Sequence, residues 1–424
     1  MSRKVPSYKF LRTASTRWAA IAPAMAVLAL ILMQPAQAQT FTVIYNFTGG
    51  NDGAYPQAGV TVDRAGNLYC TASQGGTSNR GSVCKLTHQG SGWTFKSLYS
   101  FAGPPDASAP IARTVIAPDG SLYGTTEFGG RNCGGGVGCG TVYRLQPPPG
   151  FCRNVLCPWT ETVIYRFSGG GDGANPGYGD LAFDAAGNMY GTTFYGGTNA
   201  QGVVFKLAPS GGNWTESAIH MFAGPDGVNP FSGVTLDSAG NLFGTTNSGG
   251  ANGYGTVYEL TPSGTGWTES TLYSFQLAGS GGSPYGGVVL DSAGNIYGGT
   301  SNGGTGNGGT IYELTPSGGS WTFNLLYSLT GNSYQPGLYD NLARDAAGNL
   351  YGTTRNDGAN GLGSVFKLSP EGGGWVYTSL HDFTGGSDGA NPIGGVSFDA
   401  NGNLFGTAKA GGAHGYGVIW EITP

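Results

Sequence analysis

The chain has 424 residues, of which 81 are glycine and 23 are proline, and only 10% are charged. Glycine and proline together come close to the share at which disorder is expected, but 39% of the residues are hydrophobic and 12% are aromatic, which is enough for a buried core. The formal net charge is −5, and the basic residues are scattered apart from a group at the N-terminus. An acidic chain of this kind is a poor ligand for nucleic acid, so no nucleic-acid partner is expected.

The first 38 residues have the features of a secretion signal. Five basic residues accompany an apolar run from Trp18 to Met33, and Ala36-Gln37-Ala38 forms an A-x-A cleavage pattern. The run is shorter than the roughly 20 residues that a membrane-spanning helix needs. We therefore expect residues 1–38 to be a signal peptide and 39–424 to form an exported protein without a membrane span. No sorting tail is seen before Pro424, so secretion or periplasmic residence is favoured over attachment to the cell surface.

The remaining sequence is a tandem repeat. The motif D-x-x-G-N-[LIM]-[YF]-G-T-T recurs at intervals of about 54 residues, with one longer interval. Its Asn position, called the marker below, is occupied by Asn67, Ser121, Asn188, Asn241, Asn295, Asn349 and Asn403. Each repeat holds four short segments rich in β-branched and aromatic residues, which predict strands A to D. In the fourth repeat these are residues 233–237, 241–246, 255–260 and 267–275.

Four strands in every repeat predict a β-propeller, while a parallel β-solenoid is the alternative. The two ends of the repeat array favour the propeller. The last repeat ends after its strand C, and an extra strand D lies at residues 41–47. Pairing these segments would close a ring and remove two sheet edges. We therefore predict an all-β fold: a seven-bladed propeller of four-stranded antiparallel blades over 39–424, in which residues 41–47 pair with 417–422.

Six cysteines lie within the predicted propeller, and an even number in an exported chain predicts disulfides. Cys70 and Cys84 replace the glycine of strand B and the aromatic residue of strand C in one blade, so we expect them to be joined. The other four lie in two insertions on opposite faces of the second blade, which favours Cys133–Cys139 and Cys152–Cys157. No C-x-x-C motif supports a metal site. No cofactor is expected, and a divalent cation is left open.

Departures from the repeat mark candidate site residues. Eight residues before the marker, strand A begins with glycine in four repeats, whereas the other three repeats have Arg113, Asp180 and Asn341. If strand A is innermost, these three side chains lie at one mouth of the central channel and are candidates for binding a ligand. A salt bridge between Arg113 and Asp180 is the favoured alternative. Arg344 replaces an apolar residue of strand A, and a charge at such a position needs a partner or access to water.

The loops that lead from strand D to strand A hold a second set of candidates. Five of them contain D-x-x-x-P, and a ring of these acids could bind cations or a basic partner. Turn formation is the stronger interpretation. The acids are Asp52, Asp106, Asp172, Asp226 and Asp388.

No catalytic residue is predicted. The four histidines occupy unrelated positions of the repeat, and the two G-x-S-x-G segments, 299–303 and 385–389, lie in loops rather than at a strand–turn–helix elbow.

The block D-x-x-G-N-[LY]-[YF]-G-T-T, followed by G-G and G-[TS]-V-[YF]-[KE]-L, resembles the GloVer-type tandem repeats of bacterial exported "choice-of-anchor" proteins over about 40–424. This resemblance implies export and no known reaction. The D-x-x-G-N hairpin is also weakly similar to NHL-like and lactonase-type propellers. We expect a monomeric, non-enzymatic binding module for a saccharide, for cell-envelope material or for another surface protein. The alternatives are a lyase or lactonase that uses Arg113, Asp180 and Asn341, and a purely structural surface protein.

Overall fold

The computed structural model describes residues 1, 39–90, 92–133, 136–150, 157–331 and 337–424. The chain divides into two units, one of residues 1–39 with Pro424 and one of Thr40–Thr423, and the fold below is that of the second unit. Apart from Met1, the predicted signal peptide lies outside the described residues. No helix within these ranges has the length and apolarity needed to cross a bilayer.

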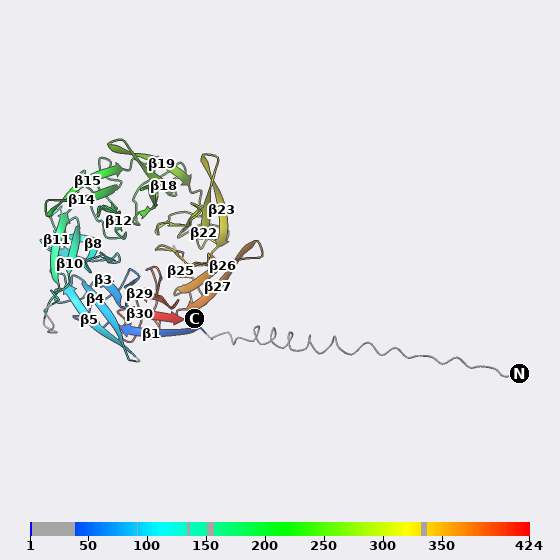
Figure 1. Cartoon of the computed structure of the whole chain (residues 1–424), viewed down its shortest axis with the longest axis horizontal. Helices are drawn as coiled ribbons and strands as arrows, with labels where there is room; N and C mark the ends of the chain where they lie inside the picture. The colour runs from blue at the N-terminus through cyan, green and yellow to red at the C-terminus, as the bar shows by residue number, and fades with distance from the viewer. Residues whose placement is uncertain (2–38, 91, 134–135, 151–156, 332–336) are drawn as a thin grey trace. The chain divides into compact units, whose positions relative to one another are not determined.

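Residues Thr40–Thr423 form seven four-stranded antiparallel sheets that follow one another around a ring (Figure 1). This confirms the seven-bladed propeller and excludes the solenoid. A further pair, β6 (Ala107–Ser108) with β9 (Phe128–Gly129), lies outside the blades.

The strands of the seven blades fall into four groups. Strand A is β2 (Thr61–Val62), β7 (Val115–Ile116), β12 (Ala182–Phe183), β16 (Thr235–Leu236), β20 (Val289–Leu290), β24 (Ala343–Arg344) and β28 (Ser397–Phe398). Strand B is β3 (Leu68–Ala72), β8 (Leu122–Thr126), β13 (Met189–Thr193), β17 (Leu242–Thr246), β21 (Ile296–Gly299), β25 (Leu350–Thr354) and β29 (Leu404–Ala408). Strand C is β4 (Ser82–Gln89), β10 (Thr141–Gln146), β14 (Val203–Ser210), β18 (Thr256–Ser263), β22 (Thr310–Ser317), β26 (Ser364–Glu371) and β30 (Val418–Thr423). Strand D is β5 (Gly92–Ser100), β11 (Thr160–Arg166), β15 (Asn213–Met221), β19 (Gly266–Ser274), β23 (Ser320–Ser328), β27 (Gly374–Asp382) and, from the start of the chain, β1 (Thr40–Asn46).

The ring closes between the two ends of the repeat array. Strand β1 pairs antiparallel with β30, from Thr40 opposite Thr423 to Asn46 opposite Val418, and the two strands lie side by side in Figure 1. This confirms the predicted pairing of 41–47 with 417–422. The last blade therefore has no unpaired strand C edge, because the first strand of the propeller covers it.

The G-T-T motif of strand B has a packing role. In the fourth blade, Gly244 pairs with Tyr258 of strand C, and a Cβ at Gly244 would collide with the tyrosine hydroxyl. The threonine that follows, Thr245, donates its hydroxyl to the carbonyl of Gly286 in the next blade, at 2.8 Å. Glycine therefore makes room for an aromatic ring inside the blade, and the threonine ties this blade to its neighbour. The same bond recurs from Thr71, Thr192, Thr353 and Thr407.

The D-x-x-G-N segment forms the turn between strands A and B. Asp237 accepts hydrogen bonds from the backbone N–H groups of Ala239 and Asn241, both at 2.8 Å, and from the Asn241 side chain at 2.9 Å. These hydrogen bonds give partners to the backbone N–H groups of the turn, which the strands leave unpaired. The same arrangement recurs at Asp63, Asp184, Asp291, Asp345 and Asp399.

Strand A is shorter than predicted. Only Thr235 and Leu236 of the predicted segment 233–237 pair with strand B. The residues before them lie against the neighbouring blade instead, and a Cβ at Gly233 would collide with the carbonyl oxygen of Asp180. The inner ends of the blades therefore meet backbone to backbone around the ring axis.

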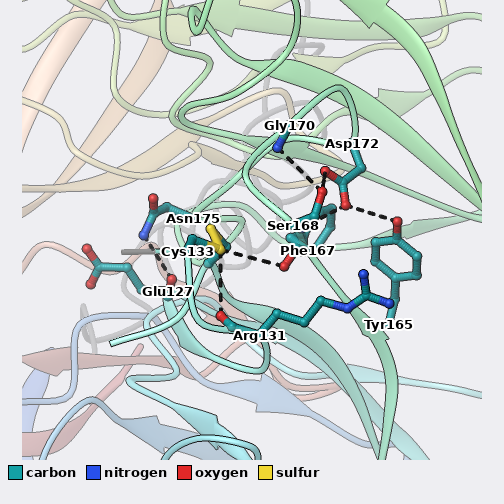
Figure 2. Close-up of a disulfide and its surroundings, with 10 residues drawn as sticks. Glu127, Arg131, Cys133, Tyr165, Phe167, Ser168, Gly170, Asp172 and Asn175 are labelled. Atoms are coloured by element: carbon teal, nitrogen blue, oxygen red, sulfur yellow. Dashed lines mark hydrogen bonds between the residues drawn. A yellow bond between two sulfur atoms is a disulfide. The ribbon is translucent and has the colours of Figure 1, made fainter. Parts of the chain in front are cut away.

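Two of the predicted disulfides are present. Cys70 and Cys84 face each other on β3 and β4 and are joined, and Cys133 is joined to Cys139 in the insertion between strands B and C of the second blade. Figure 2 shows Cys133 beside the carbonyl groups of Arg131 and Phe167. Cys157 is also disulfide-bonded, and its predicted partner Cys152 lies outside the described residues. Disulfides indicate an oxidising environment outside the cytoplasm.

Candidate functional site

A pocket of about 170 Å³ lies on the face that carries the D–A loops, and we call it the mouth pocket. Most of its wall comes from a single position of the repeat, ten residues before the marker. The lining residues from this position are Gln57, Ile111, Tyr178, Phe231, Tyr339 and Ile393. Because six of the seven blades contribute the same position, the pocket lies where the inner ends of the blades converge.

Aromatic rings from four consecutive blades form a continuous row at the mouth pocket, and three of them, Tyr178, Phe231 and Tyr339, line it. Tyr178 and Phe231 have ring centroids 4.1 Å apart, and Phe231 meets Tyr285 edge to face at 4.6 Å. Tyr285 stacks on Tyr339 at 4.5 Å with an interplanar angle of 12°. We call these four side chains the aromatic arc. Edge-to-face and offset-stacked rings hold one another in place, so the arc is a preformed surface.

Two cations from adjacent blades stand at the mouth pocket beside the arc. Arg355 follows directly after β25, and Lys409 follows directly after β29, six residues after the marker in both cases. Arg355 donates from Nη1 to the hydroxyl of Tyr339 at 2.9 Å, and its guanidinium lies 5.1 Å from that ring's centroid. Burial lowers the pKa of Lys409, and the positive charge of Arg355 lowers it further, against the opposing effect of Glu127.

Glu127 occupies the position of Arg355 and Lys409 in the second blade. It accepts a hydrogen bond from the hydroxyl of Tyr178 at 2.7 Å. Burial raises the pKa of this carboxyl, although the bond from Tyr178 and the charge of Lys409 oppose the rise. Glu127 is therefore tied to the other end of the aromatic arc.

Asp340 also lines the mouth pocket. Its carboxylate accepts the backbone N–H groups of Asn341 at 2.7 Å and Gly395 at 2.6 Å. Burial raises the pKa of Asp340, the charge of Arg113 lowers it, and the charge of Asp180 raises it. The equivalent residue in the other blades is alanine, glycine or serine, so the acid is particular to this blade.

The structure brings two of the three predicted channel residues together. Arg113 binds Asp180 through Nε at 2.7 Å and Nη2 at 2.6 Å, and the backbone N–H of Arg113 binds the same carboxylate at 3.0 Å. The side chains are 20% and 26% exposed. Arg113 also reaches Ser397 at 3.4 Å. The salt bridge between adjacent blades, which was the favoured alternative, is thus present.

Asn341 stands apart from that pair. Its side-chain oxygen accepts the backbone N–H of Gly287 at 2.6 Å, as Asp180 does for Arg113. A second cavity, of about 490 Å³, borders Arg113, Asp180 and Ser397 but does not include Asn341. Asn341 is thus not among the residues that border this cavity, and the role of the three residues in ligand binding stays a prediction.

Arg344 has an acidic neighbour that sequence analysis did not identify. Its Nη2 lies 4.0 Å from the carboxylate of Asp291 in the A–B turn of the adjacent blade, and its guanidinium lies 5.6 Å from the Tyr297 ring centroid.

The loop acids are used inside their own turns. Asp172 accepts the backbone N–H of Ser168 at 2.8 Å and the hydroxyl of Tyr165 at 3.1 Å (Figure 2). The other four accept the equivalent N–H and a tyrosine or histidine side chain from strand D: Asp52, Asp106, Asp226 and Asp388. None of the five lines the mouth pocket. Ligand binding by these acids stays a prediction.

Sequence analysis missed the residues that line the mouth pocket. The internal alignment held the signal, because the side chains ten before the marker differ in size between blades and those six after it differ in charge. Sequence analysis took its candidates for the channel from the position eight before the marker, which leads to the salt bridge of Arg113 with Asp180 instead.

Comparison with known proteins assigns the family. Residues 29–157, 134–337 and 268–424 match the Gloeobacter/Verrucomicrobia repeat. The chain belongs to this repeat family. No curated protein matches this Gloeobacter/Verrucomicrobia repeat protein.

Several solved structures are similar to this chain at low identity. A protein of unknown function from Dyadobacter fermentans is 12% identical, with a TM-score of 0.46 over 91% of this chain and 98% of the other. An ulvan lyase, a polysaccharide lyase, is 13% identical, with a TM-score of 0.47 over 87% and 94%. Among the described residues of the Gloeobacter/Verrucomicrobia repeat protein, no group of three or more His, Cys, Asp or Glu is placed to hold a metal ion.

Proposed function

We propose that the protein is an exported, non-enzymatic binding module that holds a saccharide in the mouth pocket. The aromatic arc is the observation that supports this most. A sugar ring presents an apolar C–H face that packs on an aromatic ring, and its hydroxyl groups need hydrogen-bonding partners nearby. Both kinds of group line this pocket, since Phe231 and Tyr339 stand beside Gln57 and Arg355. Sites for small ligands combine apolar walls with a few convergent polar groups.

The size of the pocket limits what it can enclose. Its volume of about 170 Å³ is below the roughly 300–1,000 Å³ of sites that bury a drug-sized ligand. We therefore expect one sugar ring or the end of a glycan chain to enter, while the remainder of a longer glycan stays outside.

The proposal of a non-enzymatic module rests on how the polar groups of the channel are used. Arg113 and Asp180 bind each other, and Asn341 binds a backbone N–H. Groups occupied in this way hold the blades together. A lyase or lactonase is the second candidate, and one observation favours it: Asp340 and Lys409 have shifted pKa values at the same pocket, which is a common feature of catalytic sites.

A glycan array tests the proposal. The exported chain, residues 39–424, is applied with and without calcium, and glycans that bind are then titrated in solution. Tyr339→Ala should weaken binding at least tenfold, because it removes one end of the arc together with the partner of Arg355. Tyr254→Ala is the matched control, since Tyr254 is an exposed aromatic residue that does not line the pocket.

Binding to no glycan, or equal binding by the two variants, would overturn the proposal. Release of a shortened or unsaturated product from a bound glycan would favour the lyase instead, and hydrolysis of a lactone would favour the lactonase.

A further inference from the structure

The geometry of the mouth pocket points to a ligand that carries a negative charge, and we propose that Arg355 and Lys409 bind this anionic group while the sugar ring packs on the aromatic arc. The ligand class would then be an acidic saccharide. The inference rests on the proposed function and narrows its ligand.

The two cations share one position of the repeat. Arg355 and Lys409 occupy the same position of two adjacent blades, directly after β25 and β29, and both line the mouth pocket. The other five blades have Ser73, Glu127, Phe194, Asn247 and Ser301 at this position. Positive charge is therefore concentrated on one side of the pocket.

The two cations differ from other arginines of the propeller in their partners. Among the described residues, Arg355 and Lys409 make no salt bridge, whereas Arg113 and Arg144 each have a carboxylate at 2.6 Å. In the part of the chain that the structure describes, Arg355 makes one side-chain hydrogen bond, from Nη1 to Tyr339. A guanidinium has five N–H donors, so donors remain for a ligand. The mutual repulsion of two neighbouring cations is unfavourable in a pocket, and a bound anion would remove it.

The two acids near the pocket are bound to other groups. Glu127 is bound to Tyr178 at the opposite end of the aromatic arc. Asp340 is bound by two backbone N–H groups and faces the charge of Arg113. Neither carboxylate lies within salt-bridge distance of Arg355 or Lys409 in the described part of the chain, so the cations remain available to an anion.

Tyr339 connects the positive charge of the pocket with its aromatic surface. Tyr339 belongs to the aromatic arc and also holds the guanidinium of Arg355 over its ring, at 5.1 Å. The apolar surface and the positive charge are therefore contiguous. An inorganic anion would use only the charge, whereas a sugar with a carboxylate or sulfate group would use both.

Titration calorimetry tests the inference. Three oligosaccharides of equal length are compared: a uronate oligomer, a sulfated oligomer and a neutral oligomer, with inorganic sulfate as a separate arm. Lys409→Met and Arg355→Gln should each weaken binding of an acidic oligomer at least tenfold and weaken binding of the neutral oligomer by a smaller factor. Lys367→Met is the matched control, because Lys367 is a lysine on strand C of the sixth blade that does not line the pocket. The uronate and sulfate arms show which acidic group is preferred.

The outcomes separate this inference from the proposed function. Equal binding of neutral and acidic oligomers, with no effect of Lys409→Met, would overturn the acidic ligand and leave the saccharide site standing. Failure of every oligosaccharide would overturn both. If inorganic sulfate competes with the acidic oligomer and binds with the same affinity, the ligand of the pocket is a small anion and not an acidic saccharide. If Arg355→Gln shifts the unfolding midpoint, its effect on binding is not specific to the pocket, and the test then rests on Lys409→Met alone.

Discussion

The tyrosine hydroxyls that lie over the strand B glycines allow a quantitative test of blade packing. Tyr258 is fully buried on β18, and its hydroxyl oxygen has no hydrogen-bond partner among the described residues. The hydroxyl lies against Gly244. Phe205 and Phe366 occupy this position in the third and sixth blades and pack over Gly191 and Gly352 in the same way. The hydroxyl is therefore not needed for packing.

The expected effect of Tyr258→Phe follows from two opposing contributions. A buried polar group without a partner costs about 1–3 kcal/mol of folding free energy. The void left by one oxygen atom costs a few tenths of a kcal/mol, by roughly 24 cal/mol for each Å³. We therefore expect the substitution to raise the free energy of unfolding by about 1–2 kcal/mol.

Urea denaturation followed by tryptophan fluorescence measures this change. The midpoint should rise while the slope stays the same, because the surface exposed on unfolding is nearly unchanged. Tyr190→Phe is the matched control. The hydroxyl of Tyr190 donates to Asp184 at 3.0 Å, so its loss should lower stability by about 0.5–1.5 kcal/mol. If Tyr258→Phe lowers the midpoint as much as the control does, the Tyr258 hydroxyl has a partner and this reasoning is wrong.

Three further predictions concern the disulfide, one acid and ring closure. Cys70→Gly with Cys84→Tyr restores the pair found in other blades, so it should melt at a higher temperature than Cys70→Ala with Cys84→Ala; equal melting temperatures would contradict this packing role. Burial raises the pKa of Glu161 to about 7, and the charge of Asp106 raises it as well. Because this folded-state pKa exceeds the unfolded value of 4.5, the associated stability is present at low pH and is lost as the pH rises through about 7. Between pH 4.5 and about 7, the urea midpoint should fall less in Glu161→Gln than in the wild type. Identical pH profiles would show that Glu161 titrates normally. Removal of residues 40–46 should expose the β30 edge and cause association in light scattering, whereas a stable monomer would show that ring closure is dispensable.

The repeat array carried most of the information about the fold. The D-x-x-G-N turn, the glycine opposite an aromatic residue and the isolated strand at 41–47 are each local patterns, and each has a direct backbone or packing consequence. Cys70 and Cys84 could be paired in advance because they replace two residues that face each other in every other blade. These predictions succeeded because they depend on neighbours along the chain or on the same position in another repeat.

The candidate site depends on contacts that close only in the ring. Arg113 reaches Ser397, 284 residues further along the chain, and Lys409 stands beside Arg355 because two blades converge there. No local pattern specifies which side chains meet at the inner ends of seven blades, since this depends on blade tilt and on the length of each loop. The repeated sequence therefore determined the blades, their number and their closure. The tertiary structure alone determined that an aromatic arc and two cations without salt-bridge partners among the described residues share one pocket.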